Sequence, residues 1–335
     1  MAKDEHSSNL KNKDTLDFAS QYKANEAELC DTVEFTPLYK ACEEGNFIQV
    51  ALLLGGGADV NFCETNGLTP LCIACQKNKY AIVKLLLNKE ADVNFMNKDG
   101  ESPLNIACKQ QLGNIVRLLL DRGVDVNSLC QPNVFSPLQN ACVTGNSYIV
   151  QILLSKGADV NFTNTIGINP LSIACIKGHT EVMMLLIENG ANINSSNKNE
   201  INPLLFACLN GQVRSTEILI EKGADVNVCQ KVGHILLQST FQFFIRTLKM
   251  MWKQFFVTSF EETCKAEQVQ VVNLLLDYQA NINLTDKYGK SPLFQACLSR
   301  NDRIVQLLLN RGARVNLQHN MGYTPLYTAC MTGDD

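Results

Sequence analysis

Cysteine and histidine are the residue types through which this chain could most readily do chemistry, because its 335 residues include 14 cysteines and four histidines. Together they could form a disulfide framework, hold zinc or supply a nucleophile with its base, and their spacing has to distinguish these roles. No histidine has cysteines or carboxylates at the spacing of a metal site or a catalytic triad. This applies to His6, His179, His234 and His319.

Other chemistry is disfavoured too. The run Gly55-Gly56-Gly57 precedes Ala58-Asp59 and closes a predicted helix, whereas a phosphate-binding loop opens one. A formal net charge of −4 disfavours a nucleic-acid partner, and a hydrophobic content of 46% excludes a disordered chain. We therefore predict no catalytic residues, no metal, no cofactor and no small-molecule substrate.

Most of the cysteines belong to a repeating pattern. Four lie six residues before a helix cap position, which a recurring Thr, Ser or Asn usually occupies, at Cys30, Cys63, Cys130 and Cys229. Nine lie six residues after it, at Cys42, Cys75, Cys108, Cys142, Cys175, Cys208, Cys264, Cys297 and Cys330. Cysteine behaves as a small hydrophobic residue in such a position. Because helices in neighbouring layers lie roughly 10 Å apart, we expect buried, unpaired thiols rather than disulfides.

The pattern itself is Thr, Ser or Asn followed by Pro-Leu, with spacings of 33 or 34 residues up to Asn202. Its first residues are Thr36, Thr69, Ser102, Ser136, Asn169, Asn202, Ser291 and Thr324. A second phrase of the type Ala-Asp-Val-Asn follows at a fixed distance, as in Ala58–Asn61 and Ala91–Asn94. Thr, Ser and Asn cap helix N-termini, and Pro suits the first helical position, so a helix should begin at each Pro.

Each unit should contain a second helix, which in the first unit begins near Phe47 and ends at Gly57, where glycine suits a left-handed C-cap. Turn dipeptides such as Asn66-Gly67 and Asp99-Gly100 should form the tips of projecting hairpins. Helices this short are marginal alone, so each unit must bury its apolar face against the next.

The 33-residue period and these two phrases resemble ankyrin repeats over residues 35–234 and 258–335. The resemblance implies an all-α solenoid of helix-turn-helix units with projecting β-hairpin loops, about eight to nine units in all. Glu90 and Gln279 replace the C-cap glycine, so units two and seven should be less stable. The His that usually follows Thr-Pro-Leu is absent from every unit. It is replaced by Tyr39, Cys72, Asn105, Gln139, Ser172, Leu205, Phe294 and Tyr327.

The predicted organisation has four segments. Residues 1–34 form a polar segment with a degenerate repeat remnant, residues 35–234 hold repeats 1 to 6 and the start of repeat 7, and residues 258–335 hold repeats 7 to 9. Repeat 9 lacks its second helix, so we expect the chain to be a fragment of a longer protein. The register resumes at Thr258, with Cys264 in the cysteine position.

Residues 235–257 interrupt the array and should form a basic amphipathic helix, with Trp252 and the cations Arg246, Lys249 and Lys253. This insertion could pack on the stack as a lid, bind calmodulin or a membrane surface as a peptide-like helix, or dock a specific partner. Its three charges exclude a transmembrane span.

The resemblance implies that a protein partner binds the loop tips and the exposed face of each first helix. By register, the candidate contact residues are Leu68, Lys77, Glu101, Lys109, Phe135, Val143, Ile166, Ile168, Ile176, Ile201 and Leu209. From unit four to unit six these positions are apolar, and exposed apolar patches mark interaction sites.

The predicted function is therefore a non-catalytic scaffold or adaptor for protein binding. The alternative is a substrate-targeting or regulatory module of a larger enzyme, such as a ubiquitin ligase or a kinase. The N-terminus has no apolar signal segment, so we expect a cytoplasmic or nuclear protein with reduced thiols and do not expect membrane association.

Overall fold

A computed structural model describes residues 35–127, 134–165, 167–196, 202–226, 258–286 and 288–332, with the backbone alone for residues 258–267. The chain divides into an N-terminal part, Met1–Asp159, and a C-terminal part, Val160–Asp335. The predicted insertion at 235–257 and the segment 1–34 lie outside the described residues.

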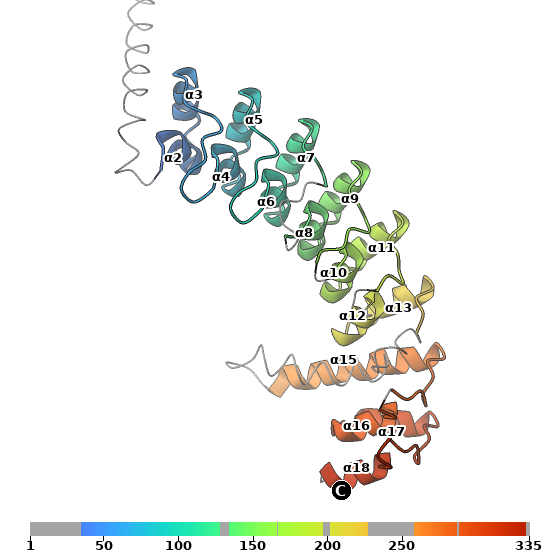
Figure 1. Ribbon diagram of the computed structural model, residues 1–335. Helices are drawn as coiled ribbons and strands as arrows, with labels where there is room; N and C mark the ends of the chain where they lie inside the picture. Colours follow the sequence, from blue (N-terminus) through green and yellow to red (C-terminus); the bar gives the residue numbers. More distant parts are fainter. Residues whose placement is uncertain are drawn as a thin grey trace, which may run out of the picture. The chain divides into compact units, whose positions relative to one another are not determined.

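The N-terminal part contains four helix pairs, one for each of repeats 1 to 4 (Figure 1). First helices pack on first helices of the neighbouring repeats, and second helices pack on second helices. The pairs are α2 (Pro37–Glu44) with α3 (Phe47–Gly55), α4 (Pro70–Gln76) with α5 (Tyr80–Asn88), α6 (Pro103–Lys109) with α7 (Gly113–Asp121), and α8 (Pro137–Thr144) with α9 (Ser147–Ser155).

The C-terminal part continues the same architecture. It contains α10 (Pro170–Lys177) with α11 (Thr180–Glu188), α12 (Pro203–Leu209) with α13 (Val213–Glu221), α15 (Thr258–Asp277), α16 (Pro292–Leu298) with α17 (Asp302–Asn310), and α18 (Pro325–Thr332). None of the described helices combines the length and the apolar character needed to cross a membrane.

The predicted helix starts are confirmed at every described Pro. The Thr36 hydroxyl accepts a hydrogen bond from the Tyr39 N–H at 3.3 Å, and the Asn202 side chain accepts one from the Leu205 N–H at 2.8 Å. Ser136 and Gln139 form a reciprocal capping box. Each cap satisfies a backbone donor that the helix itself leaves unpaired.

The positions that follow the second helices have left-handed backbone, as predicted. Gly57, Gly123 and Gly157 have φ of 90°, 78° and 84°, and Glu90 and Gln279 keep this conformation with φ of 63°. Asn78, Gln111 and Arg300 also have positive φ, at the turn between the two helices of a repeat.

The predicted core is confirmed for the described cysteine positions of repeats 1 to 6 and 8. Cys42, Cys75 and Cys108 are fully buried beside the equally buried Ala41, Ala74 and Ala107. No disulfide joins any of the described cysteines, and Cys63 and Cys330 are exposed. The thiols therefore contribute as small apolar groups.

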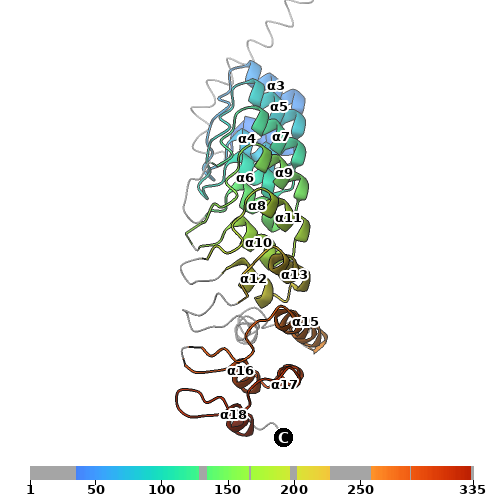
Figure 2. The same ribbon diagram turned by 90° about the vertical axis from the view of Figure 1, so that its right-hand side faces the viewer.

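The loops lie on one side of the first helices in each part (Figure 2). The predicted β-hairpins are turns instead, and no strand occurs among the described residues. In repeat 2 the Glu64 N–H donates to the Leu68 carbonyl at 3.0 Å, and the Gly67 N–H donates to the Glu64 carbonyl at 2.8 Å. One hydrogen bond across the loop does not make a β-ladder, so no strand forms.

Asparagine side chains connect successive repeats through these loops. Asn61 Oδ1 accepts from the Asp92 N–H at 2.7 Å, and Asn127 Oδ1 accepts from the Asp159 N–H at 2.8 Å. Asn127 Nδ2 also donates to the Gly157 carbonyl at 3.0 Å. The bond from a backbone N–H of the next repeat to the Asn Oδ1 recurs at Asn94, Asn161, Asn194 and Asn283. The final Asn of the second phrase is thus an inter-repeat connector.

Repeat 7 differs from the predicted helix-turn-helix unit. Its residues form one continuous helix, α15, which packs on α13 and α17. Where other repeats have a left-handed turn residue and an N-cap residue, repeat 7 has Glu267 and Gln268. Both are good helix formers, but repeat 3 makes this turn at Gln111 and Leu112 without a glycine or a side-chain cap, so these two residue types alone do not explain the continuous helix.

Candidate protein-binding surface

Two positions of each repeat lie outside the core, one on the loop side of the first helix and one at the end of that helix. The pre-cap position precedes the capping residue, and the helix-end position lies seven residues after it. Buried positions such as Leu38, Leu71 and Leu104 keep one residue type from repeat to repeat. The pre-cap and helix-end positions instead differ from repeat to repeat and include acidic, basic, aromatic and aliphatic residues.

Ion pairs lie at or beside these positions in the first three repeats. Lys77 Nζ lies 3.1 Å from Glu43 Oε1, which joins repeats 2 and 1. Lys109 Nζ lies 2.8 Å from Glu101 Oε1, so the helix-end and pre-cap side chains of repeat 3 meet. Leu68, the pre-cap residue of repeat 2, is half-buried. The ion pairs are mostly exposed and contribute little to stability, but they fix where charge is presented.

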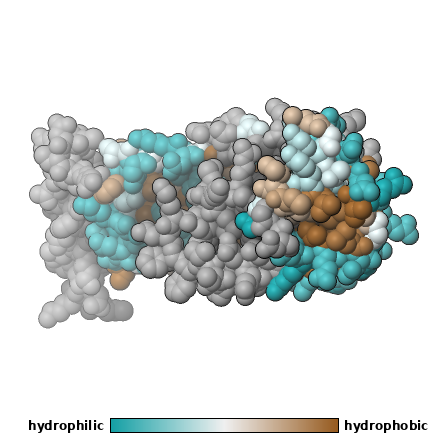
Figure 3. Space-filling view, turned by 90° about the horizontal axis from the view of Figure 1, so that it is seen from below, coloured by the Kyte–Doolittle hydropathy of each residue, from teal (hydrophilic) through white to brown (hydrophobic). Residues whose placement is uncertain are grey.

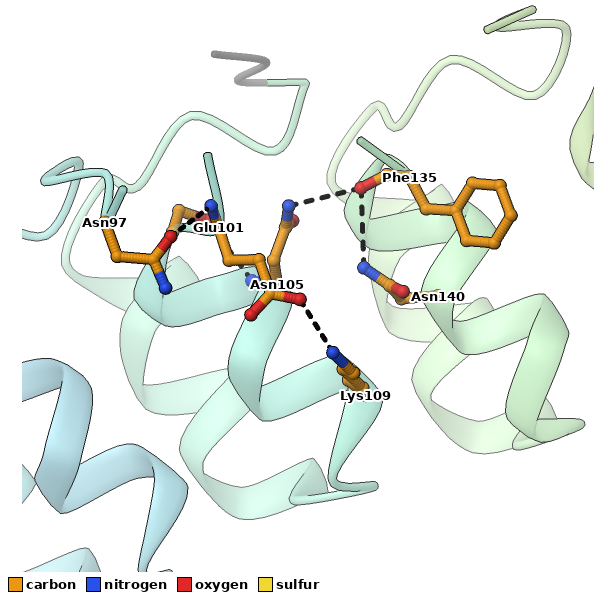
Figure 4. A network of polar contacts seen from close by, with 7 residues as sticks. Asn97, Glu101, Asn105, Lys109, Phe135 and Asn140 are labelled. Carbon is orange, nitrogen blue, oxygen red and sulfur yellow. Dashed lines mark hydrogen bonds and ion pairs between the residues drawn. The ribbon is translucent and has the colours of Figure 1, made fainter. Parts of the chain in front are cut away.

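Phe135 is held in place by buried amides of two repeats. Its carbonyl oxygen accepts from Asn105 Nδ2 at 3.2 Å and from Asn140 Nδ2 at 3.4 Å, and both amides are buried. Figure 4 shows the Phe135 ring pointing away from these amides and from the Glu101–Lys109 pair. Asn105 occupies the position where the family's usual His is absent, and it supplies a side-chain hydrogen bond there.

Asn97 completes this network from the loop of repeat 3. Its Oδ1 accepts from the Glu101 N–H at 2.8 Å, so the backbone that carries Glu101 is also fixed (Figure 4). A recognition surface benefits from such pre-organisation, because less conformational freedom is lost on binding.

The predicted apolar residues of repeats 4 to 6 are less exposed than their positions suggested. Phe135 and Val143 in the N-terminal part are half-buried, as are Ile168, Ile176 and Leu209 in the C-terminal part. Neighbouring side chains cover part of each. The remaining predicted residues lie outside the described residues, namely Ile166, Ile201, Arg246, Lys249, Trp252 and Lys253.

Sequence reasoning missed the more exposed apolar residues of repeats 8 and 9. They include Leu298 at 42%, Met321 at 71%, Tyr323 at 39% and Met331 at 71% exposed. Figure 3 looks at the molecule from below and shows hydrophobic side chains gathered between hydrophilic ones. The signal was present, because Tyr323 has the pre-cap position, and Leu298 and Met331 have the helix-end position.

Four rings stack through the same two repeats. His319 lies between Phe294 and Tyr323 with centroid distances of 5.3 and 5.7 Å, and Tyr323 lies 4.7 Å from Tyr327. The planes differ by at most 12°. His319 Nδ1 accepts from the Met321 N–H at 3.1 Å, so this histidine has a structural role in the loop.

The described titratable groups are not gathered into a metal-binding cluster. No group of three or more His, Cys, Asp or Glu side chains among the described residues could hold a metal ion. Burial raises the pKa of the Cys42 thiol to about 12 and raises those of Cys75 and Cys108 as well. Buried protonated thiols are poor nucleophiles and poor metal ligands.

Comparison with protein-family models identifies the repeats. The model described as "Ankyrin repeats (3 copies)" matches residues 7–97, 38–130, 87–164, 138–229 and 261–335. The first four matches overlap, and the five together span most of the chain, including most of α15. No curated protein matches the chain closely enough to count as a relative. From its helix pairs, its inter-repeat asparagines and these matches, the chain belongs to the ankyrin repeat family.

Proposed function

We propose that this chain is a non-catalytic scaffold or adaptor that binds a partner protein through its pre-cap and helix-end positions. Ankyrin repeats are typically protein–protein interaction modules. The observation that carries the proposal is a difference in how residue types vary from repeat to repeat. Core residues repeat almost unchanged, while the pre-cap and helix-end residues differ from one repeat to the next.

That contrast has a physical basis. The stack is held by buried Leu, Ala and Cys side chains and by the asparagine bonds between loops, none of which uses the variable positions. Side chains at those positions are therefore available for recognition. Phe135 supports the proposal most directly, since Asn105 and Asn140 fix the backbone that carries it and aromatic side chains are good binding anchors.

Reduced thiols suit the cytoplasm or the nucleus, and we propose that the protein acts there. Any partner would then meet a surface whose third repeat presents Glu101 and Lys109 and whose fourth presents Phe135 and Val143.

Affinity capture from the native cells tests the proposal. The tagged full chain is compared with a Phe135→Glu, Ile168→Glu double variant and with Tyr80→Glu as the matched control. Tyr80 is an apolar side chain on a second helix, 45% exposed, and lies at neither variable position. We expect the double variant to lose the proteins that the wild type and the control both capture, with circular dichroism showing equal helix content. Capture that is unchanged by the double variant would overturn the proposed surface.

A further inference from the structure

The second helices of the N-terminal part pack in a row whose first described member is α3 (Figure 1). One side of α3 carries exposed apolar residues, with Ile48 72% and Leu52 61% exposed. Leu85 and Leu118, at the position of Leu52 in α5 and α7, are half-buried, and each of these two helices has a preceding second helix packed on it. Apolar residues that are exposed here but covered in the following repeats mark a contact site.

Exposure in two helices identifies which positions face each neighbour. In α3, which no described second helix precedes, Gln49 is exposed, whereas its counterpart Ile82 in α5 is buried. In α17, which no described second helix follows, Val305 is half-buried and Leu309 is 44% exposed, four and eight residues after the N-cap residue Asn301. Their counterparts in α3 are the buried residues Val50 and Leu54. We call these the forward positions, because they face the following repeat, and the position of Gln49 the backward position.

Residues 14–25, which lie outside the described residues, have the sequence pattern of one second helix. Asp14 suits the N-cap position that Asn46 occupies in α3, and it precedes Asn46 by 32 residues, one fewer than the usual period. Asn25 then falls at the position of Gly57, where the backbone is left-handed. Asparagine is among the few residues that accept this conformation at a helix C-terminus.

The side chains between these two caps divide into an apolar and a polar face. Phe18 and Tyr22 lie four and eight residues after Asp14, at the forward positions. Asp17 has the backward position, and Gln21 lies one helical turn beyond it. A terminal repeat needs an apolar side toward the array and a polar side toward water, and this register supplies both.

The first helix of repeat 1 does not require a similar cover. Lys40 of α2 is exposed, whereas Ile73 and Ile106, at the same position of α4 and α6, are 2% and 5% exposed. Residues 4–13, where a preceding first helix would fall, contain a single apolar side chain, Leu10. A single helix on α3 therefore accounts for the apolar surface better than a complete helix pair.

The chain itself provides the occupant of this surface. The family match begins at residue 7, well before α2 starts at Pro37. From these observations we infer that residues 14–25 form a single capping helix that packs on α3, with Phe18 and Tyr22 against Ile48 and Leu52. This packing is separate from the proposed binding surface, because Ile48 and Leu52 lie at neither the pre-cap nor the helix-end position.

The competing occupant is a second copy of the chain. The ten residues 26–35 connect the capping segment to the cap of α2. A connection of this length holds the segment near α3 at an effective concentration on the order of millimolar, above the concentration at which a second copy is present in solution. The segment of the same chain is therefore favoured.

Photocrosslinking of the full chain tests this packing. The photoreactive residue p-benzoylphenylalanine replaces Ile48, whose side chain is mostly exposed, and unlabelled chains are mixed with nitrogen-15-labelled chains. Trypsin cleaves after Lys13 and Lys23, so residues 14–23 are recovered as one peptide that mass spectrometry identifies. We expect the α3 peptide to be joined to residues 14–23 of the same chain, as pairs in which both peptides carry the same isotope.

Variants locate the contact. Phe18→Asp with Tyr22→Asp places two carboxylates toward the apolar side of α3 and should reduce the crosslink yield by about tenfold. The matched control, Asp17→Ala with Gln21→Ala, changes the polar face and should leave the yield within about twofold. In a second control the photoreactive residue replaces Ala81, which has the position of Ile48 in α5, and no crosslink to residues 14–23 should form. Circular dichroism should show equal content of the described helices in all variants.

Three results would overturn the inference. Pairs of mixed isotope would show that a second copy covers α3. Absence of any crosslink to residues 14–23 would show that this segment does not lie on α3. An equal yield with and without the two aspartates would show that Phe18 and Tyr22 do not make the contact. Cell capture through Phe135 and Ile168 depends on none of these outcomes, so the proposed function stands or fails separately.

Discussion

Replacing Glu90 by glycine should stabilise repeat 2, because the left-handed backbone at this position strains a residue that has a Cβ atom. Glu90 has φ of 63°, whereas repeats 3 and 4 place Gly123 and Gly157 there with φ of 78° and 84°. Left-handed backbone costs an ordinary residue about 1–2 kcal/mol, and replacement by glycine removes this strain. Glycine also gives the unfolded chain more conformational entropy, which destabilises the folded state by about 0.5–1 kcal/mol. The net gain is about 0.5–1 kcal/mol.

The reciprocal variant Gly123→Glu makes the comparison sharp. A Cβ atom at Gly123 would meet no atom within 4 Å, so the substitution adds backbone strain without a clash. It should lose about what Glu90→Gly gains. Glu90→Ala keeps the Cβ atom and should gain much less, which separates strain from the loss of the Glu90 carboxylate.

Urea unfolding of the full chain, followed by circular dichroism, measures these changes. A change of 0.5–1 kcal/mol corresponds to a midpoint shift of roughly 0.3–0.5 M urea. The shift should be upward for Glu90→Gly and downward for Gly123→Glu, with unchanged slope. If Glu90→Gly lowers the midpoint, or if Gly123→Glu leaves it unchanged, backbone strain at this position is not what distinguishes repeat 2.

Four further outcomes are expected. Asn127→Ala removes the hydrogen bonds to the Asp159 N–H and the Gly157 carbonyl and should lower the free energy of unfolding by about 1–2 kcal/mol in urea titrations. Asn127→Asp keeps an oxygen that can accept from the Asp159 N–H, so it should lose about half as much. Alkylation of the native chain followed by mass spectrometry should label Cys63 and Cys330 and spare the other described cysteines, which are buried; labelling of Cys108 at the rate of Cys63 would contradict the structure. Burial raises the Cys42 pKa from 9.0 to about 12, so this thiol ionises at lower pH in the unfolded chain than in the folded one. Its contribution to the free energy of unfolding should therefore be constant below pH 9 and decline between pH 9 and 12. Urea titrations at pH 8 and 10.5 should show a smaller decline for Cys42→Ala than for the wild type. Lys109→Gln removes an exposed ion pair and should change thermal stability by less than about 0.5 kcal/mol; a larger loss would show that the Glu101 pair matters to folding.

Helix starts could be predicted from the sequence because the signal is local and repeated. A capping side chain followed by Pro specifies the first turn without help from the rest of the fold, as Thr36 and Asn202 show. The left-handed residues Asn78, Gln111 and Arg300 were not predicted. Asn tolerates this conformation, but at Gln111 and Arg300 helix packing on both sides imposes it against the preference of the residue.

Repeat 7 shows a different limit. Register alone suggested two helices, but register records where a turn would fall and not whether the residues there can make it. Glu267 and Gln268 offer neither a glycine nor a capping side chain, and the structure has one helix across them. Gln111 and Leu112 also lack both, yet repeat 3 makes the turn there, so the outcome depends on packing as well as on the two residues.

The candidate surface was predictable in position and not in exposure. Register places Ile176, Leu209 and Met331 at one position, yet the first two are half-buried and Met331 is 71% exposed. Leu38 and Leu326 likewise share a position and are 2% and 69% exposed. Burial depends on the side chains of adjacent repeats, which a one-dimensional pattern does not contain.

The asparagine bonds between loops give each interface its own reporter. The amide protons of Asp92, Asp125 and Asn192 belong to exposed residues in turns, where amides normally exchange quickly with solvent. Each is bonded to the Asn side chain of the preceding repeat. Hydrogen-exchange spectra should therefore show slow amides recurring once per repeat among fast ones. The opening of a single interface would release one such amide alone, so the order in which the repeats separate could be recorded one contact at a time.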